Sequence, residues 1–276
     1  MAIQTSDITL SGKVGDHIHY KRNGKNFTRK AAKEYNLSAG SQKSGKEFGE
    51  ASAAGALIRK GFALFINMIN GGRDQGLVNR LNGKLVQVIN TGPVALKGTR
   101  KVTDGDVGLL SGIELNPFTT LGALFSVSPE ITVDPLNGIC IALPSFTPEA
   151  VFQRKYHTSR EAVISIMCCT FDFPGKNGRM SVAEDLVLPV NEVVFPGGTL
   201  EFPLDTLDER VLIVGVMVHF RGDKGDPIQN RKYVAASLEK AILVREGKIV
   251  PFIYPREETP VPQTASQAVK VAWKLK

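Results

Sequence analysis

The chain has 276 residues, of which 42% are hydrophobic and 22% charged, and this ordinary composition excludes disorder along its whole length. Its three cysteines exclude a disulfide-rich secreted scaffold. The net charge of +7 is uneven, because residues 1–101 hold 17 Lys and Arg against 6 Asp and Glu, while the rest is mildly acidic. Such a chain suits an anionic polymer, or head-to-tail contact with another copy of itself.

The first predicted element is a β-hairpin near the N-terminus. Asn23-Gly24 is the favoured pair for a two-residue type I′ turn, whose central residues need positive φ. This turn places Tyr20 opposite Phe27, so both aromatic side chains share one face. Because an isolated hairpin is marginally stable in water, we expect the aromatic pair to dock on another surface. The residues predicted to form this assembly arm are Ile18, Tyr20, Asn23, Gly24 and Phe27.

Basic side chains flank the aromatic pair. They form a predicted basic patch of Lys13, Lys21, Arg22, Lys25, Arg29 and Lys30. Aromatic rings beside cations are typical of single-strand binding surfaces, so nucleic acid is one partner that this patch would suit. The alternative is the acidic face of a neighbouring subunit. No helix-turn-helix or RNP-type motif accompanies the patch.

A single amphipathic helix is predicted over about residues 45–69. Ser44 and Glu47 have the spacing of a capping box at its start. Asn70-Gly71-Gly72 supplies a stop signal at its end, and a short helix or turn is expected over residues 75–81. The apolar positions recur at three- and four-residue steps, at Phe48, Ala51, Ala54, Ile58, Phe62, Phe65 and Ile69.

From residue 84 onward the pattern predicts short strands separated by Pro or Gly. None of the connections is long enough for a crossover helix, so the pattern favours a mainly β fold: an antiparallel β-sandwich, Ig-like or jelly-roll-like. The expected strands are LVQVIN, ITVDP, GICIALP, AVISIMCCTFDF, EVVFP, TLEFPL, RVLIVGVMVHF and EKAILV. The predicted divisions are a hairpin arm plus helix (1–83), a sandwich region (84–254) and a tail (255–276).

No catalytic, cofactor or metal site is predicted. His17 and His19 share one face of a strand, but no further ligand has a spacing that completes a metal site. Cys168 and Cys169 lie in an apolar strand and would point to opposite faces, as buried thiols. Phosphate-loop, dinucleotide and serine-hydrolase motifs are absent. The chain is therefore not expected to be an enzyme.

The sequence also carries a localisation prediction. Its first residues lack the basic and apolar regions of a secretory signal. The longest apolar run, Val211–Val218, is far shorter than the roughly 20 residues of a membrane helix. We expect cytoplasmic synthesis, no membrane partner, and either retention or release as a particle such as a virion.

Several ordered motifs resemble an uncharacterised protein family of Bacteroidetes. The N-terminal ones are SGKVG at 11–15, YKRNGK at 20–25 and the basic pair at 29–30, followed by a helix ending in Gly61-Phe62. Later segments similar to the family are GICIALPSFTPEAVF with AVISIMCCTFDF, and VGVMVHF with RKYVAASLEKAILV. The family has no assigned activity. The resemblance implies a β-rich layout and a Bacteroidetes or phage origin, and it supplies no catalytic residues.

The pattern as a whole favours a non-enzymatic structural protein that assembles with itself. In this interpretation the N-terminal arm and exposed sheet edges join subunits of a homo-oligomer. The uneven charge favours a heterologous contact, which builds rings or filaments such as a phage virion component. The alternative is a nucleic-acid-binding protein that uses the basic arm.

Overall fold

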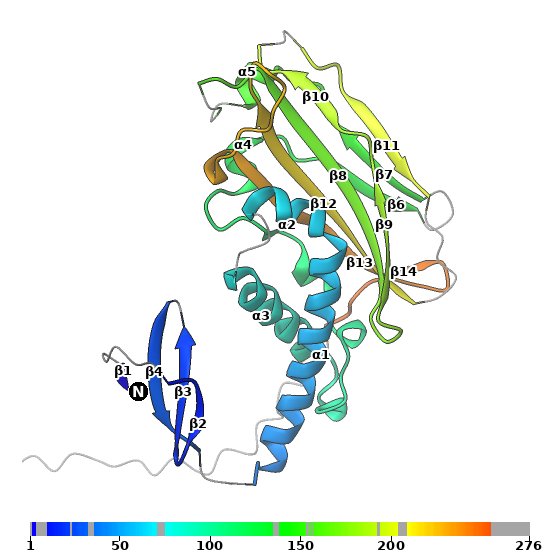
Figure 1. The fold of residues 1–276 in the computed structure, drawn as a ribbon. Helices are drawn as coiled ribbons and strands as arrows, with labels where there is room; N and C mark the ends of the chain where they lie inside the picture. Colours follow the sequence, from blue (N-terminus) through cyan, green and yellow to red (C-terminus); the bar gives the residue numbers. More distant parts are fainter. Residues whose placement is uncertain are drawn as a thin grey trace, which may run out of the picture. The chain divides into compact units, whose positions relative to one another are not determined.

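The computed structural model describes residues 2–3, 10–22, 24–32, 36–70, 75–134, 138–152, 155, 157–191, 194–203 and 209–254. The chain forms two compact units, Met1–Gln42 and Lys43–Lys276 (Figure 1). The predicted boundary at residues 83 and 84 instead falls inside a helix, because the helices that follow residue 42 pack with the large sheet. The predicted tail, 255–276, lies outside the described residues.

The N-terminal unit contains a four-stranded antiparallel sheet. Its strand order is β1-β4-β3-β2, so the predicted hairpin lies at its centre. Tyr20 pairs with Phe27 and Ile18 with Arg29, which confirms the predicted register. Gly24 has φ +78° in the turn, while Asn23 lies outside the described residues. The strands are β1 (Ala2–Ile3), β2 (Gly12–Val14), β3 (His17–Arg22) and β4 (Lys25–Lys30).

The predicted single helix is two helices, α1 (Ala39–Gly61) and α2 (Ala63–Asn70), with a bend of 76° between them. The helical start is six residues earlier than predicted, because the Ser38 hydroxyl accepts a hydrogen bond from the backbone N–H of Ser41 at 3.1 Å. The predicted capping role of Glu47 is therefore wrong, since this residue lies within α1.

Residues 85–90, predicted as a strand, lie in α3 (Gln75–Thr91). The β-branched content of LVQVIN suggested a strand, but the buried side chains recur with helical spacing along the whole segment. The fully buried positions of this stripe are Leu77, Leu81, Leu85, Val88 and Ile89. Tertiary burial of the helical stripe therefore outweighs the local β propensity.

A seven-stranded antiparallel sheet forms the centre of the second unit. Its three long strands are β8 (Glu161–Asp172), β12 (Arg210–Arg221) and β13 (Val234–Arg245), which adjoin in that order. They match three predicted apolar strands. Shorter strands complete the sheet: β5 (Ile113–Glu114), β9 (Asn177–Val182), β10 (Leu186–Pro189) and β14 (Lys248–Val250).

Among the described residues of this unit, the remaining strands form a three-stranded antiparallel sheet with the order β11-β7-β6. It consists of β6 (Glu130–Asp134), β7 (Gly138–Leu143) and β11 (Gly198–Phe202). EVVFP forms no strand among its described residues, where Phe195 makes an isolated bridge to Phe146. The short helices are α4 (Leu121–Leu124), α5 (Pro148–Val151), and the 3₁₀ turns η1 (Val94–Leu96), η2 (Val102–Asp104), η3 (Val107–Leu110) and η4 (Arg231–Tyr233).

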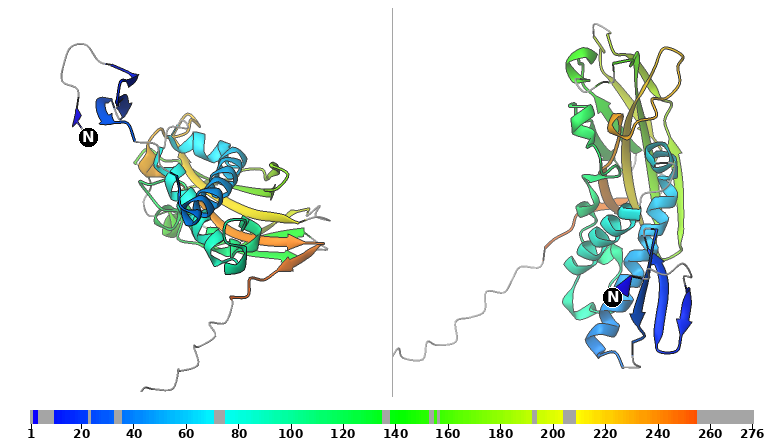
Figure 2. Two further views of the ribbon diagram at one scale, coloured as in Figure 1. Left: turned by 90° about the horizontal axis from the view of Figure 1, so that it is seen from below. Right: turned by 60° about the vertical axis from the view of Figure 1, so that its left-hand side comes forward.

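The two faces of the large sheet have different partners. One face packs against α1, α2 and α3 in one hydrophobic cluster. The other packs against the inward side chains of β6, β7 and β11 in a second cluster. Figure 2 gives two further views of these layers. The fold is thus rich in antiparallel sheet with helices on one side. The sheets are open, and an Ig-like or jelly-roll sandwich is not confirmed.

The bend between α1 and α2 packs against the large sheet at Gly215. A Cβ atom at Gly215 in β12 would lie 2.5 Å from the ring of Phe62 and 3.3 Å from that of Phe65. The pairing of β12 with β13 also shifts register between Val214 and Gly215. Only a residue without a side chain lets both phenyl rings approach the strand backbone.

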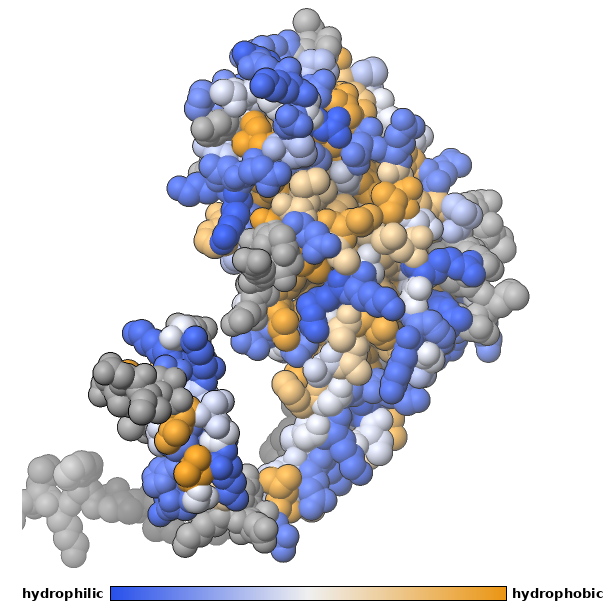
Figure 3. Space-filling model, viewed as in Figure 1, coloured by the Kyte–Doolittle hydropathy of each residue, from blue (hydrophilic) through white to orange (hydrophobic). Residues whose placement is uncertain are grey.

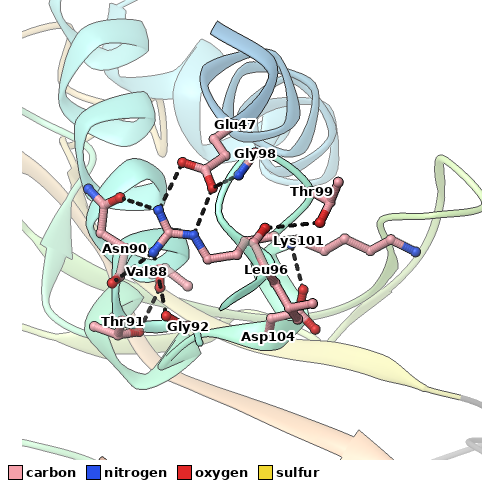
Figure 4. Close-up of polar contacts among 11 residues, drawn as sticks. Glu47, Val88, Asn90, Thr91, Gly92, Leu96, Gly98, Thr99, Lys101 and Asp104 are labelled. Carbon is pink, nitrogen blue, oxygen red and sulfur yellow. Dashed lines mark hydrogen bonds and ion pairs between the residues drawn. The ribbon is translucent and has the colours of Figure 1, made fainter. Parts of the chain in front are cut away.

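A buried ion pair ties α1 to the loop after α3 (Figure 4). Glu47 Oε1 accepts hydrogen bonds from Arg100 Nε and from the backbone N–H of Gly98, each at 2.7 Å, and Oε2 accepts from Arg100 Nη2 at 2.9 Å. The Arg100 guanidinium also donates to the Asn90 side chain at 3.1 Å. Arg100 therefore holds the pKa of Glu47 below its ordinary value.

Among the described residues, no single helix has both the length and the apolarity to cross a membrane. The bent pair of α1 and α2 passes that test only when its two helices are taken together.

Candidate functional site

The pairing of the N-terminal sheet decides which side chains share a face. Neighbours directly across antiparallel strands project to the same side, and successive residues along a strand alternate. Ile3 pairs with Phe27, Phe27 with Tyr20, Ile18 with Arg29, Lys13 with Ile18, and Arg22 with Lys25. We call the resulting surface the aromatic face: Ile3, Lys13, Ile18, Tyr20, Arg22, Lys25, Phe27 and Arg29.

The aromatic face has an apolar centre between two basic ends. The rings of Tyr20 and Phe27 stack with their centroids 5.8 Å apart and their planes inclined by 24°. The row at one end carries Lys13 and Arg29, and the row at the other carries Arg22 and Lys25. Figure 3 shows hydrophobic side chains among hydrophilic ones on the surface of this unit. An occupant of this face would therefore need a flat centre and anionic groups on both sides.

The structure divides the predicted basic patch between the two faces of the sheet. Lys21 and Lys30 project to the opposite side from Tyr20 and Phe27. That polar face also carries His19, whose Nδ1 is hydrogen-bonded to Thr28 Oγ1 at 2.9 Å. The sequence prediction treated all six cations as one patch, and the paired register separates them.

None of the described side chains of the N-terminal unit is buried. Tyr20, Phe27 and Ile18 are half-buried, and the side chain of Ile3 is 56% exposed. Ile3 was not among the residues predicted for this surface, because a two-residue strand is too short to show an alternating pattern. Its contribution follows only from the pairing of β1 with β4.

The cysteines do not form a reactive centre with each other. Cys168 and Cys169 pack in different hydrophobic clusters on opposite sides of β8, as the alternation predicted. Burial raises the pKa of both thiols to about 12. Cys140 in β7 is only half-buried. Within the described part of the chain, no group of three or more His, Cys, Asp or Glu lies close enough together to hold a metal ion.

A groove of about 640 Å³ lies between the 3₁₀ turns around residue 105 and strands β13 and β14. Its carboxylates take part in local structure. Asp104 accepts from the backbone N–H of Lys101 at 2.7 Å. Asp106 accepts from the N–H of Gly108 at 3.0 Å and from the Tyr254 hydroxyl at 2.5 Å. The groove therefore gives no arrangement that indicates a reaction, and the aromatic face is the better candidate site.

Comparisons with known proteins place the chain in no family. No protein-family model and no curated protein matches its sequence. One solved structure, the crystal structure of a protein assigned as ApaA from Bordetella pertussis, aligns with 43% of this chain and 89% of its own. The identity is 15% and the TM-score 0.23. A likeness at that TM-score carries no argument about fold or function.

Proposed function

We propose that this chain is a non-enzymatic protein that assembles with itself through the aromatic face of its N-terminal sheet. The observation that carries the proposal is the combination of an apolar centre, two basic ends and the lack of any buried side chain among the described residues of this unit. A unit of this size buries too little apolar surface to be stable by its own core. Contact with a partner would bury the stacked rings.

The nature of the partner follows from the pattern of the face. Another copy is favoured because the chain itself supplies the acidic complement: residues 102–276 hold more Asp and Glu than Lys and Arg. A contact between two different surfaces of identical chains is heterologous and builds rings or filaments. The proposed setting is a structural particle such as a virion. This setting, like the proposed membership of the Bacteroidetes family, is based on the sequence motifs that resemble that family.

Nucleic acid is the second candidate partner. Four cations share the aromatic face with two stacked rings, which is the residue pattern of single-strand binding surfaces. The two candidates differ in what they need: self-assembly proceeds with the pure protein, whereas nucleic-acid binding leaves the pure protein monomeric.

Light scattering on the full-length protein at high concentration tests the proposal. We expect assemblies in low salt that become smaller in high salt, because the ends of the contact are charged. The variant Arg22→Glu/Lys25→Glu reverses one end of the aromatic face and should remain monomeric. The matched control Lys21→Glu/Lys30→Glu makes the same charge change on the polar face and should assemble like the wild type.

Two results would contradict self-assembly through this face. One is a wild-type monomer at every concentration and salt. The other is equal assembly of the aromatic-face variant and its control. A monomer that binds single-stranded oligonucleotides, with the same dependence on Arg22 and Lys25, would identify nucleic acid as the partner instead.

A further inference from the structure

The outward face of the three-stranded sheet has a chemical pattern complementary to the aromatic face. Ile131, Val133 and Leu200 pack against the second hydrophobic cluster, so the alternating residues point away from it. The outward positions are Glu130, Thr132 and Asp134 in β6, Gly138, Cys140 and Ala142 in β7, and Thr199 and Glu201 in β11. We call this surface the acidic sheet face. It carries three carboxylates and no Lys or Arg.

The small side chains of the acidic sheet face lie where a flat aromatic pair could rest. Register places Thr132, Cys140 and Glu201 in one row, and Glu130, Ala142 and Thr199 in the next. The outward positions of the central strand, β7, thus hold only the small residues Gly138, Cys140 and Ala142. An aromatic ring can approach such a surface closely, because no long side chain stands in its middle.

The spacing of the charges matches on the two faces. Ile18 and Arg22 mark the two basic rows of the aromatic face and lie four residues apart along β3. Glu130 and Asp134 also lie four residues apart along β6. Four residues of strand span about 13 Å in both cases. Cations at both ends of one face can therefore meet carboxylates at both ends of the other while the rings lie between them.

We propose that the acidic sheet face of one copy is the docking site for the aromatic face of a second copy. This inference rests on the proposed function and names its partner surface. The contact joins unlike surfaces, so every assembly keeps one free docking site at one end and one free arm at the other, and it can grow.

The size of the acidic sheet face makes each contact weak. Three strands spaced about 4.8 Å apart and five residues long cover about 240 Å². Stable protein pairs bury roughly 800 Å² on each partner. Single contacts are therefore short-lived, and an experiment that traps them covalently is better suited than one that requires them to survive separation.

Cys140 supplies such a trap in the native chain. It lies at the centre of the acidic sheet face and is half-buried, whereas Cys168 and Cys169 are buried with strongly raised pKa values. Ile18→Cys places a second thiol on the aromatic face. Because position 18 lies one row from the rings that would rest over Cys140, a short bifunctional thiol cross-linker is used, and we expect a ladder of oligomers that contain the cross-link between position 18 and Cys140. Lys21→Cys, which places its thiol on the polar face, should give several-fold less product.

Charge exchange tests the same contact without a cross-link. Glu130→Lys/Glu201→Lys should abolish assembly in light scattering, and combining it with Arg22→Glu/Lys25→Glu should restore it. The control Glu149→Lys/Glu246→Lys makes the same charge change on α5 and on the turn between β13 and β14, and it should assemble normally.

The outcomes separate this inference from the function it rests on. Assembly that needs Arg22 and Lys25, without a ladder through Cys140 and without an effect of the Glu130 and Glu201 changes, would overturn the docking site and leave self-assembly standing. A cross-link confined within one chain would overturn the second copy as occupant. A wild-type monomer under all conditions would overturn both proposals, whereas the ladder together with the rescued double variant would support both.

Discussion

The two units of this chain differ in how far their side chains are buried. The second unit buries two extensive hydrophobic clusters and even encloses an ion pair, Glu47 with Arg100. The N-terminal unit pairs four strands and stacks two rings, yet none of its described side chains is buried. The comparison indicates that hydrogen-bonded strands alone define the geometry of a surface, whereas stability requires a buried layer.

The largest expected effect comes from breaking the buried ion pair of the second unit. Glu47→Ala leaves the Arg100 guanidinium buried without its carboxylate and the Gly98 N–H without an acceptor. We expect a loss of about 3–5 kcal/mol in the free energy of unfolding, measured by urea denaturation. Lys46→Ala, at the exposed neighbouring position, should change it by less than about 0.5 kcal/mol.

A second substitution tests whether the loss reflects an unpaired charge. Glu47→Ala/Arg100→Met removes both charges and should recover a substantial part of the stability. If Glu47→Ala/Arg100→Met is as unstable as Glu47→Ala alone, the loss of stability comes from the missing connection between α1 and the loop, and the unpaired charge of Arg100 does not cause it.

A smaller effect is expected at Glu114, where burial works against the native charge. Both carboxylate oxygens accept from the backbone N–H of Leu121, at 3.0 and 3.1 Å. Burial, together with the nearby Glu239, raises the pKa of Glu114 to about 7 from 4.5. A raised pKa stabilises the folded state fully below pH 4.5, and this advantage is lost as the pH rises through 7.

Glu114→Gln removes this pH dependence. At pH 8 the variant should be more stable than the wild type by about 1–2 kcal/mol, a value reduced from the full shift because the side chain is partly exposed. The difference should shrink toward zero near pH 5, as urea midpoints at both pH values would reveal. Glu149→Gln, at an exposed position, should alter neither midpoint. A variant less stable than the wild type at pH 8 would contradict the burial cost.

The sequence predicted the elements whose pattern is local. The Asn-Gly turn set the register of β3 and β4, and apolar runs located β7, β8, β12 and half of β13. The sequence prediction was wrong where contacts with residues far away in the chain determine the local structure. Residues 85–90 are helical because their apolar stripe packs on the sheet. Glu47 forms a buried ion pair with Arg100, and the two residues are 53 positions apart in the chain.

The residues of the candidate surfaces also divide into those that a local pattern predicts and those that depend on distant strands. Tyr20 and Phe27 were predictable because one turn fixes their pairing. The separation of Lys21 and Lys30 from the other cations follows once the alternation is applied to that register. Ile3 and the acidic sheet face could not be found in advance, because they depend on which strands lie side by side: β1 beside β4, and β7 between β6 and β11.

The smallest expected effect distinguishes the two units directly. Tyr20→Ala removes the ring that stacks on Phe27, and such a pair contributes about 0.5–1.5 kcal/mol. Amide hydrogen exchange of β3 and β4, measured at a protein concentration too low for assembly, should become several-fold faster. The urea midpoint of the second unit should stay the same, because its hydrophobic clusters contain no residue before Ala51. Lys21→Ala, on the polar face of the same strand, should affect neither measurement. A shift of the main unfolding transition by Tyr20→Ala would mean that the N-terminal sheet stabilises the second unit within one chain, and the contrast between the two units would then fail.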